Sequence, residues 1–157
     1  IKKALKNFSG VQRRLTKVFK KNKIEFYDDY AHHPTEIKSV LEGIRIIAPD
    51  RKIISVFQPH RYSRIKSLKL EFASCFKNCD QVILCPVYPA GEPIDKKYNT
   101  KRFAKLILKF SKAQVILIKN ESDLAKYFRK NLIKDEIVIG MGAGSISKWI
   151  YNLKNFL

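Results

Sequence analysis

Short runs of apolar residues alternate with longer segments of helical spacing along most of the chain, and this alternation constrains the fold most strongly. The predicted strands are residues 24–27, 52–57, 81–85, 115–118 and 136–140, and the predicted helices are residues 34–47, 68–76, 102–110, 122–132 and 145–153. Pro34 suits the first turn of a helix, and Ser122 is placed to cap another. Five strand–helix units in series predict an α/β, Rossmann-like fold, a doubly wound and mostly parallel sheet with helices on both faces.

The first twenty residues lie outside this alternation. They read as a helix remnant, a turn at Ser9–Gly10 and an edge strand. Because the chain has no initiator methionine, we expect it to be part of a longer protein.

The charge of the chain is strongly positive. With 32 Lys and Arg against 14 Asp and Glu in 157 residues, the formal net charge is +18, which predicts affinity for anions. Lysines are spread evenly, however, and neither a helix-turn-helix nor an aromatic-basic RNA-recognition motif is present. These features favour a phosphorylated small substrate over specific nucleic-acid binding.

Two further observations predict a cytoplasmic protein. No apolar run approaches the ~18–20 residues of a membrane span, and the basic N-terminus lacks a signal-peptide core. The three cysteines, Cys75, Cys79 and Cys85, are odd in number and clustered, which is typical of reduced thiols.

Distinctive side chains gather in the loops that leave the carboxyl ends of the predicted strands. In a doubly wound sheet these ends meet at one edge, where ligands bind. The loops are residues 28–36, 58–64, 86–93 and 140–145, and they hold all three histidines, His32, His33 and His60. The loops at the opposite edge are plain, so the sequence predicts a ligand site at the carboxyl edge.

Arg61 and Arg64 form a candidate anion clamp beside His60. Guanidinium groups bind carboxylates and phosphates through paired hydrogen bonds, although two solvated arginines remain the alternative. Asp28 and Asp29 also have two interpretations. They are either carboxylates that favour a turn and helix start, or acceptors for a ribose diol.

The glycine turn at residues 140–145 precedes a helix, as anion-binding turns do. Ser145 stands where a dinucleotide fingerprint needs glycine, and the turn belongs to the last unit, so an NAD(P)-dependent oxidoreductase is not supported. The turn is either close-packed or substrate-facing. A zinc site from the three histidines is disfavoured, because adjacent histidines point apart and no Cys-x-x-Cys pair accompanies them.

Longer motifs in these loops resemble the Mur ligases. Residues 28–36 read Asp-Asp-Tyr-Ala-His-His-Pro-Thr-Glu, and residues 57–64 read Phe-Gln-Pro-His-Arg-Tyr-Ser-Arg. Residues 8–14, 88–94 and 142–146 also resemble segments of that family. The resemblance is to the C-terminal domain, covers nearly the whole chain, and is specific because the two long motifs occur together.

The resemblance implies an ATP-dependent, ADP-forming ligase that joins L-alanine to UDP-N-acetylmuramate through an acyl phosphate in peptidoglycan synthesis. It implies catalytic roles for His32, Arg61 and Arg64, and substrate binding by these three together with Tyr30, Tyr88 and Glu92. Arg14 would approach the phosphates of ATP, and Asp29 would hold its ribose. Mg²⁺ is implied by ATP, with its ligands expected in a central domain rather than in this chain.

This sequence contains no Gly-x-x-Gly-Lys-Ser/Thr phosphate loop and neither the UDP-binding nor the central ATPase domain, so we expect the chain alone to be inactive. Residues 1–16 are expected to form an interdomain joint and edge segment, with a hinge near residues 10–16, and residues 17–157 the C-terminal domain. Its expected partners are UDP-N-acetylmuramate, L-alanine, ATP and its own other domains. Two alternatives stay open: the C-terminal domain of the murein-tripeptide recycling ligase, and a basic Rossmann-like module that binds polyanions.

Overall fold

A six-stranded sheet forms the centre of the computed structural model, which describes residues 13–157; the helix remnant and the Ser9–Gly10 turn expected from the sequence lie outside these residues. The strand order is β1-β2-β6-β3-β4-β5. The strands are β1 (Thr16–Lys21), β2 (Ile24–Asp29), β3 (Ile53–Phe57), β4 (Gln81–Leu84), β5 (Gln114–Leu117) and β6 (Ile137–Met141). Only the pairing of β1 with β2 is antiparallel among the described strands. The predicted mostly parallel sheet and its edge strand are confirmed.

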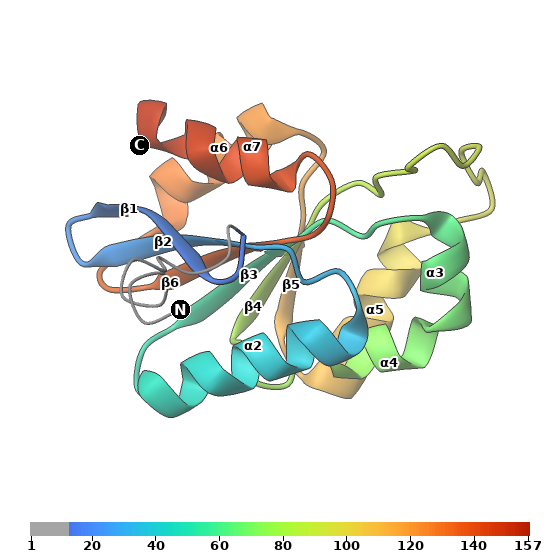
Figure 1. Cartoon of the computed structure of the whole chain (residues 1–157), viewed down its shortest axis with the longest axis horizontal. Coiled ribbons are helices and arrows are strands. Elements are labelled where there is room, and N and C mark those ends of the chain that lie inside the picture. The colour runs from blue at the N-terminus through green and yellow to red at the C-terminus, as the bar shows by residue number, and fades with distance from the viewer. Residues whose placement is uncertain (1–12) are drawn as a thin grey trace, which may run out of the picture.

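Helices cover both faces of this sheet (Figure 1). One face carries α2 (Pro34–Ile47), α3 (Tyr62–Ser67), α4 (Lys69–Ser74) and α5 (Thr100–Ser111), and the other carries α6 (Glu121–Asn131), α7 (Ile146–Asn152) and the short helix η1 (Leu153–Asn155). Two apolar clusters fill the layers between sheet and helices. No helix within residues 13–157 has both the length and the apolar content needed to cross a bilayer.

The apolar strands of the sequence are buried because the sheet is covered on both sides. Every residue of β3 and of β6 is buried. Leu41 of α2 and Ile107 of α5 pack in the cluster on one face, and Phe26 of β2 and Phe128 of α6 in the cluster on the other. The helices are therefore held by apolar burial on opposite sides of the same strands.

Several element boundaries differ from the sequence-based expectation, and three differences have a clear physical cause. Strand β2 continues through Asp29, because residues 28 and 29 pair with β6 instead of starting a loop. A helix begins at Tyr62, whereas the sequence predicted a loop there and a helix from residue 68. The predicted cap Ser122 was wrong, because the side chain of Asn120 accepts the hydrogen bond from the backbone N–H of Asp123 and caps α6.

The three cysteines are buried free thiols within the apolar layers. Burial raises the pKa of Cys79 and of Cys85 to about 12 and moves that of Cys75 in the same direction. A thiol that stays protonated is a poor nucleophile, so these cysteines act as small packing groups.

A cluster of charged side chains ties together the amino ends of the strands. Arg51 donates hydrogen bonds to the carboxylate of Glu25 at 2.8 Å and to the backbone carbonyls of Lys23 at 3.0 Å and Asp135 at 2.6 Å. Glu25 also accepts a hydrogen bond from Lys17 of the edge strand. The amino edge therefore carries a structural ion-pair network.

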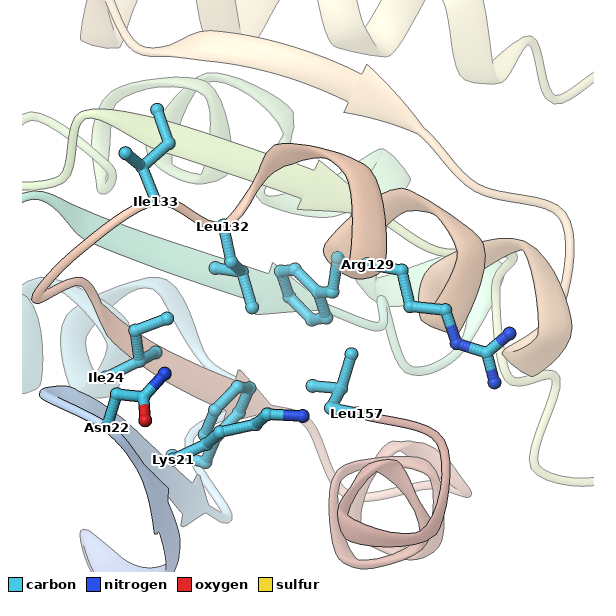
Figure 2. Close-up of a pocket in the computed structure, with 9 residues that line it drawn as sticks. Lys21, Asn22, Ile24, Arg129, Leu132, Ile133 and Leu157 are labelled. Carbon is cyan, nitrogen blue, oxygen red and sulfur yellow. The ribbon is translucent and has the colours of Figure 1, made fainter.

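A hollow of about 200 Å³ lies beside the start of β2 and the end of α6, away from the carboxyl ends of the strands, and Figure 2 shows the residues that line it. Ile24, Leu132 and Leu157 form part of its apolar wall, and Lys21 and Arg129 lie alongside. None of the described residues that line it is a histidine or carries a side-chain carboxylate. The hollow thus differs from the carboxyl edge, where histidines and carboxylates gather.

The network at the amino edge predicts a stability change at low pH. Hydrogen bonds from Lys17, and then from Arg51, lower the pKa of Glu25 from its ordinary 4.5 to about 2. A lowered carboxyl pKa stabilises the fold above the unfolded value, and this contribution is lost as the pH falls through the folded value. We therefore expect the free energy of unfolding to fall between about pH 4.5 and 2 by about 1 kcal/mol more in the native chain than in Glu25→Gln. Urea unfolding at several pH values measures this difference, and parallel profiles would contradict it.

Candidate functional site

Two buried carboxylates at the end of β2 organise the carboxyl edge. Asp29 is 1% exposed, and its two oxygens accept backbone hydrogen bonds from Leu15 and from Ala31, both at 2.7 Å. Asp28 is fully buried and accepts hydrogen bonds from Arg13 at 3.2 Å and from Ser147 of α7 at 2.7 Å. These bonds hold the segment before β1, the loop after β2 and the start of α7 against one another.

Four aromatic rings from three loops lie in a row along this edge. The ring centroids of Tyr30 and His32 are 5.1 Å apart, those of His32 and His60 5.8 Å, and those of His60 and Tyr88 5.5 Å. The two tyrosines at the ends are more than a third exposed. The predicted convergence of these loops is confirmed, and Tyr30, His32, His60 and Tyr88 are called the ring row below.

The two adjacent histidines have different environments. His33 caps α2, since its ring accepts a hydrogen bond from the backbone N–H of Thr35, while the Glu36 carboxylate accepts from the backbone N–H groups of both histidines. The Nδ1 atom of His32 lies 3.0 Å from the carbonyl oxygen of Tyr30. A carbonyl can only accept, so Nδ1 is the protonated nitrogen and Nε2 is the ring nitrogen that can act as an acceptor.

Arg61 and Arg64 follow His60 at the start of α3. Arg64 is partly buried and its guanidinium lies 3.3 Å from Nδ1 of His60. Burial, followed by the positive charge of Arg64, holds the pKa of His60 below its ordinary 6.5. His60 is therefore neutral near pH 7, and the exposed Arg61 and the partly buried Arg64 supply the positive charge beside it.

Arg61 adopts an unusual backbone conformation, with φ of 70° and ψ of 131°. Such positive φ values strain a residue that has a Cβ. The backbone N–H of Arg61 donates to the carbonyl of Tyr88 at 2.9 Å, and that of Tyr88 donates to the carbonyl of Pro59 at 2.8 Å. These bonds between two loops hold Arg61 in its strained conformation at the edge of the sheet.

Glu92 ties the loop after β4 to the start of α3. Its carboxylate accepts hydrogen bonds from the backbone N–H of Ser63 at 3.1 Å and from the hydroxyl of the same residue. These two bonds lower the pKa of Glu92, with the hydroxyl contributing most. Its contacts in this structure are those of a helix cap, and the expected binding of substrate by Glu92 stays a prediction.

The glycine turn after β6 packs beneath the ring row. Gly142 has a φ of 147°, and a Cβ there would lie 2.7 Å from the carbonyl oxygen of Gln58. At Gly144 a Cβ would lie 2.6 Å from Cγ of Tyr88. The side-chain amide of buried Gln58 bonds to the hydroxyl of Ser145 and to the backbone N–H of Ile146, both at 3.0 Å. Of the two interpretations of this turn, the structure favours close packing.

The two residues expected to bind the nucleotide differ in accessibility. Arg14 is more than half exposed, and its guanidinium lies 3.9 Å from the Glu36 carboxylate. Asp29 is buried and both of its oxygens already accept backbone hydrogen bonds, so a ribose would have to share or replace these. Both nucleotide roles stay predictions.

Sequence reasoning missed two residues that build this edge, Gln58 and Arg13. Gln58 is one residue of the motif at residues 57–64 with nothing to mark a structural role, and nothing in the sequence distinguishes Arg13 from Arg14. Within residues 13–157, no group of three or more His, Cys, Asp or Glu side chains could hold a metal ion.

Comparison with known proteins identifies a matching family model and relatives of the whole chain. Residues 13–144 match the family model described as Mur ligase, glutamate ligase domain. The chain is 48% identical over its whole length to a UDP-N-acetylmuramate–L-alanine ligase of Pelagibacter ubique and 38% identical to one of Bradyrhizobium. It covers 34% and 33% of those two proteins, so it spans about a third of the length of the curated relatives.

Solved structures share the fold. The UDP-N-acetylmuramate–alanine ligase of Thermotoga maritima aligns with a TM-score of 0.75 and 26% identity, over 98% of this chain and 31% of that one. A murein peptide ligase of Psychrobacter arcticus aligns with a TM-score of 0.79 over 98% of this chain and 32% of that one, and its 20% identity supports similarity of fold alone.

The strain at Arg61 predicts an order of stability between two variants that both lose the guanidinium. Arg61→Gly removes the Cβ and relieves the strained φ, whereas Arg61→Ala keeps it. We expect the glycine variant to be the more stable of the two by about 1 kcal/mol in urea unfolding. An alanine variant that is as stable or more stable would show that the positive φ carries no strain.

Proposed function

Because it matches the glutamate ligase domain model over residues 13–144, the chain belongs to the Mur ligase family, and we propose that it is the C-terminal domain of an ATP-dependent UDP-N-acetylmuramate–L-alanine ligase. The observation that carries this proposal is the ring row with Arg64 beside His60, in a chain 48% identical to a ligase of that name. Such an edge suits an amino acid and an activated carboxylate, which together carry several negative charges.

The reaction proceeds in two steps that balance. A carboxylate oxygen of UDP-N-acetylmuramate attacks the γ-phosphorus of ATP, and ADP leaves, which forms an acyl phosphate. The neutral amine of L-alanine then attacks the acyl carbon and forms a tetrahedral intermediate. Collapse of that intermediate expels inorganic phosphate, and the nitrogen loses a proton as the amide forms.

Arg61 and Arg64 bind the anions of this reaction. A guanidinium presents paired donors to the carboxylate of L-alanine or to the oxygens of the acyl phosphate. Fixed positive charge also stabilises the oxyanion that develops in the tetrahedral intermediate. Tyr30 and Tyr88, at the two ends of the ring row, form the walls beside the amino acid, and Glu92 holds the loop that carries Tyr88.

In this proposal His32 accepts a proton. Its Nδ1 atom donates to the carbonyl of Tyr30, so the opposite nitrogen is the free acceptor. That acceptor takes the proton that the amine of L-alanine must lose. Neutral His60 lies beside it without adding a positive charge that would oppose this transfer.

Arg14 and Asp29 lie on the nucleotide side of the proposal. The exposed guanidinium of Arg14 reaches toward the phosphates of ATP, and Asp29 holds the ribose after exchanging a backbone hydrogen bond. Mg²⁺ accompanies ATP in this chemistry, but the described residues form no metal site and no step here depends on one.

The proposed domain supplies half of an active site in a cytoplasmic enzyme of cell-wall synthesis. The chain covers about a third of its relatives, so the UDP-binding and ATPase parts come from the rest of the longer protein. In this arrangement residues 17–157 form the C-terminal domain, and the proposed joint at residues 1–16 lies within the described part of the chain only at residues 13–16.

A chimeric ligase tests the proposal. We replace the matching third of the Pelagibacter ubique relative with this chain and measure phosphate release with ATP, Mg²⁺ and UDP-N-acetylmuramate. We expect release that depends on L-alanine, and none from the 157-residue chain alone. Arg64→Gln in the chimera should lower kcat/KM about 100-fold or more, whereas Arg102→Gln, on exposed α5 surface, should leave it unchanged.

Three outcomes would contradict the proposal. Release with murein tripeptide but not with L-alanine would assign the chain to the recycling ligase. A chimera that is inactive with every acceptor, beside an active unmodified relative, would exclude a ligase role, and salt-dependent retention on DNA would then favour the polyanion-binding module. ATP hydrolysis by the isolated chain would show that it is more than half a site.

A further inference from the structure

Arg13 links three parts of the carboxyl edge through one side chain. Its Nε donates to the buried Asp28 carboxylate at 3.2 Å, and a terminal nitrogen donates to the carbonyl of Gly142 at 2.5 Å. The carbon of the same guanidinium lies 4.7 Å from the centroid of the Tyr30 ring. Three-quarters of the Arg13 side chain is buried, so these contacts are shielded from solvent.

The backbone of Arg13 is held as firmly as its side chain. Its N–H donates to the hydroxyl of Thr16 at 3.0 Å, and its carbonyl accepts from the N–H of Tyr30 at 2.8 Å. The N–H of Leu15 donates to the carboxylate of Asp29. Residues 13–16 are therefore tied to the carboxyl edge through backbone as well as side-chain hydrogen bonds.

The contact with Tyr30 leads into the ring row. Tyr30 meets His32 edge to face, and the Tyr30 carbonyl fixes the orientation of the His32 ring through Nδ1. His32 in turn lies against His60. A change in the position of the Tyr30 ring would thus reach both His32 and His60, which lie beside Arg61 and Arg64 (the arginine pair).

We infer that Arg13 is a positioning residue that holds Tyr30, and through Tyr30 the ring row, in the geometry that receives the amino acid. The part of this inference that concerns the amino acid rests on the proposed function. Arg13 also belongs to the segment by which the chain enters the domain. Its contacts couple the placement of that segment to the geometry of the site, because the guanidinium reaches Tyr30 only while Asp28 and Gly142 hold it.

Arg45 provides a matched control at the opposite edge of the sheet. Its side chain is as exposed as that of Arg13, at 26%. It donates to the carbonyls of Pro49 and Arg51, both at 2.9 Å, and to the carboxylate of Asp80 at 2.7 Å. Arg45→Lys therefore removes a comparable set of hydrogen bonds without touching the ring row.

The first test uses the 157-residue chain and does not depend on catalysis. In Arg13→Lys we expect the aromatic NMR signals of Tyr30 and His32 to shift, and the amide hydrogen of Tyr30 to exchange about tenfold faster or more. Arg45→Lys should leave these signals and this exchange rate unchanged even though it loses stability. Arg13→Met, which keeps an apolar stem without the guanidinium, should shift the same signals and serves if the lysine variant does not fold.

The second test uses the active chimera. Arg13→Lys should raise the KM for L-alanine about tenfold while it changes the KM for ATP less than twofold, and Arg45→Lys should change neither. Unchanged ring signals in a folded Arg13 variant, or equal shifts in Arg45→Lys, would overturn the inference. An inactive chimera would count against the proposed ligase function, whereas the NMR result on the isolated chain would still decide whether Arg13 positions the ring row.

Discussion

The parallel pairing of β2, β6 and β3 is the constraint on which the rest of the structure depends. Asp29 of β2 and Phe57 of β3 both lie opposite Met141 of β6, so the three strands end at the same level. Every loop that follows them then starts from one edge, which is where such sheets bind ligands. Asp28 and Asp29 are buried at that level. They hold the neighbouring segments in place at the shared edge, because their oxygens accept hydrogen bonds from side chains and backbone amides of those segments.

Rigidity at this edge comes from contacts between loops as well as from hydrogen bonds within the loop after β2. Tyr88 binds Pro59 and Arg61 through its backbone and lies over Gly144, and Glu92 caps the start of α3. A positive φ at Arg61 persists in such surroundings because its neighbours hold it. A site that must present positive charge to several anions benefits from this preorganisation, since its donors need no rearrangement when the charge develops.

The sequence was sufficient to predict the sheet, most helices and the edge that carries the site, because those features follow from apolar periodicity and strand order. It was insufficient where a distant partner decides the structure. The first turn of α3 shows no apolar periodicity and is capped by Glu92 from another loop. Asp28 and Asp29 looked like loop residues, since charged groups are rarely buried without partners, and those partners lie in separate segments. The sequence does not distinguish Arg13 from its neighbour Arg14, yet Arg13 packs over the Tyr30 ring and Arg14 is exposed.

The central claim is that the amino acid binds at the carboxyl edge between the ring row and the arginine pair. The most direct measurement is a crystal structure of the chimeric ligase with L-alanine, UDP-N-acetylmuramate and a non-hydrolysable ATP analogue. The account predicts the L-alanine carboxylate within hydrogen-bonding distance of Arg61 or Arg64, with the amine facing His32 and the side chain between Tyr30 and Tyr88. L-Alanine bound in the complex without contact to either arginine would contradict it.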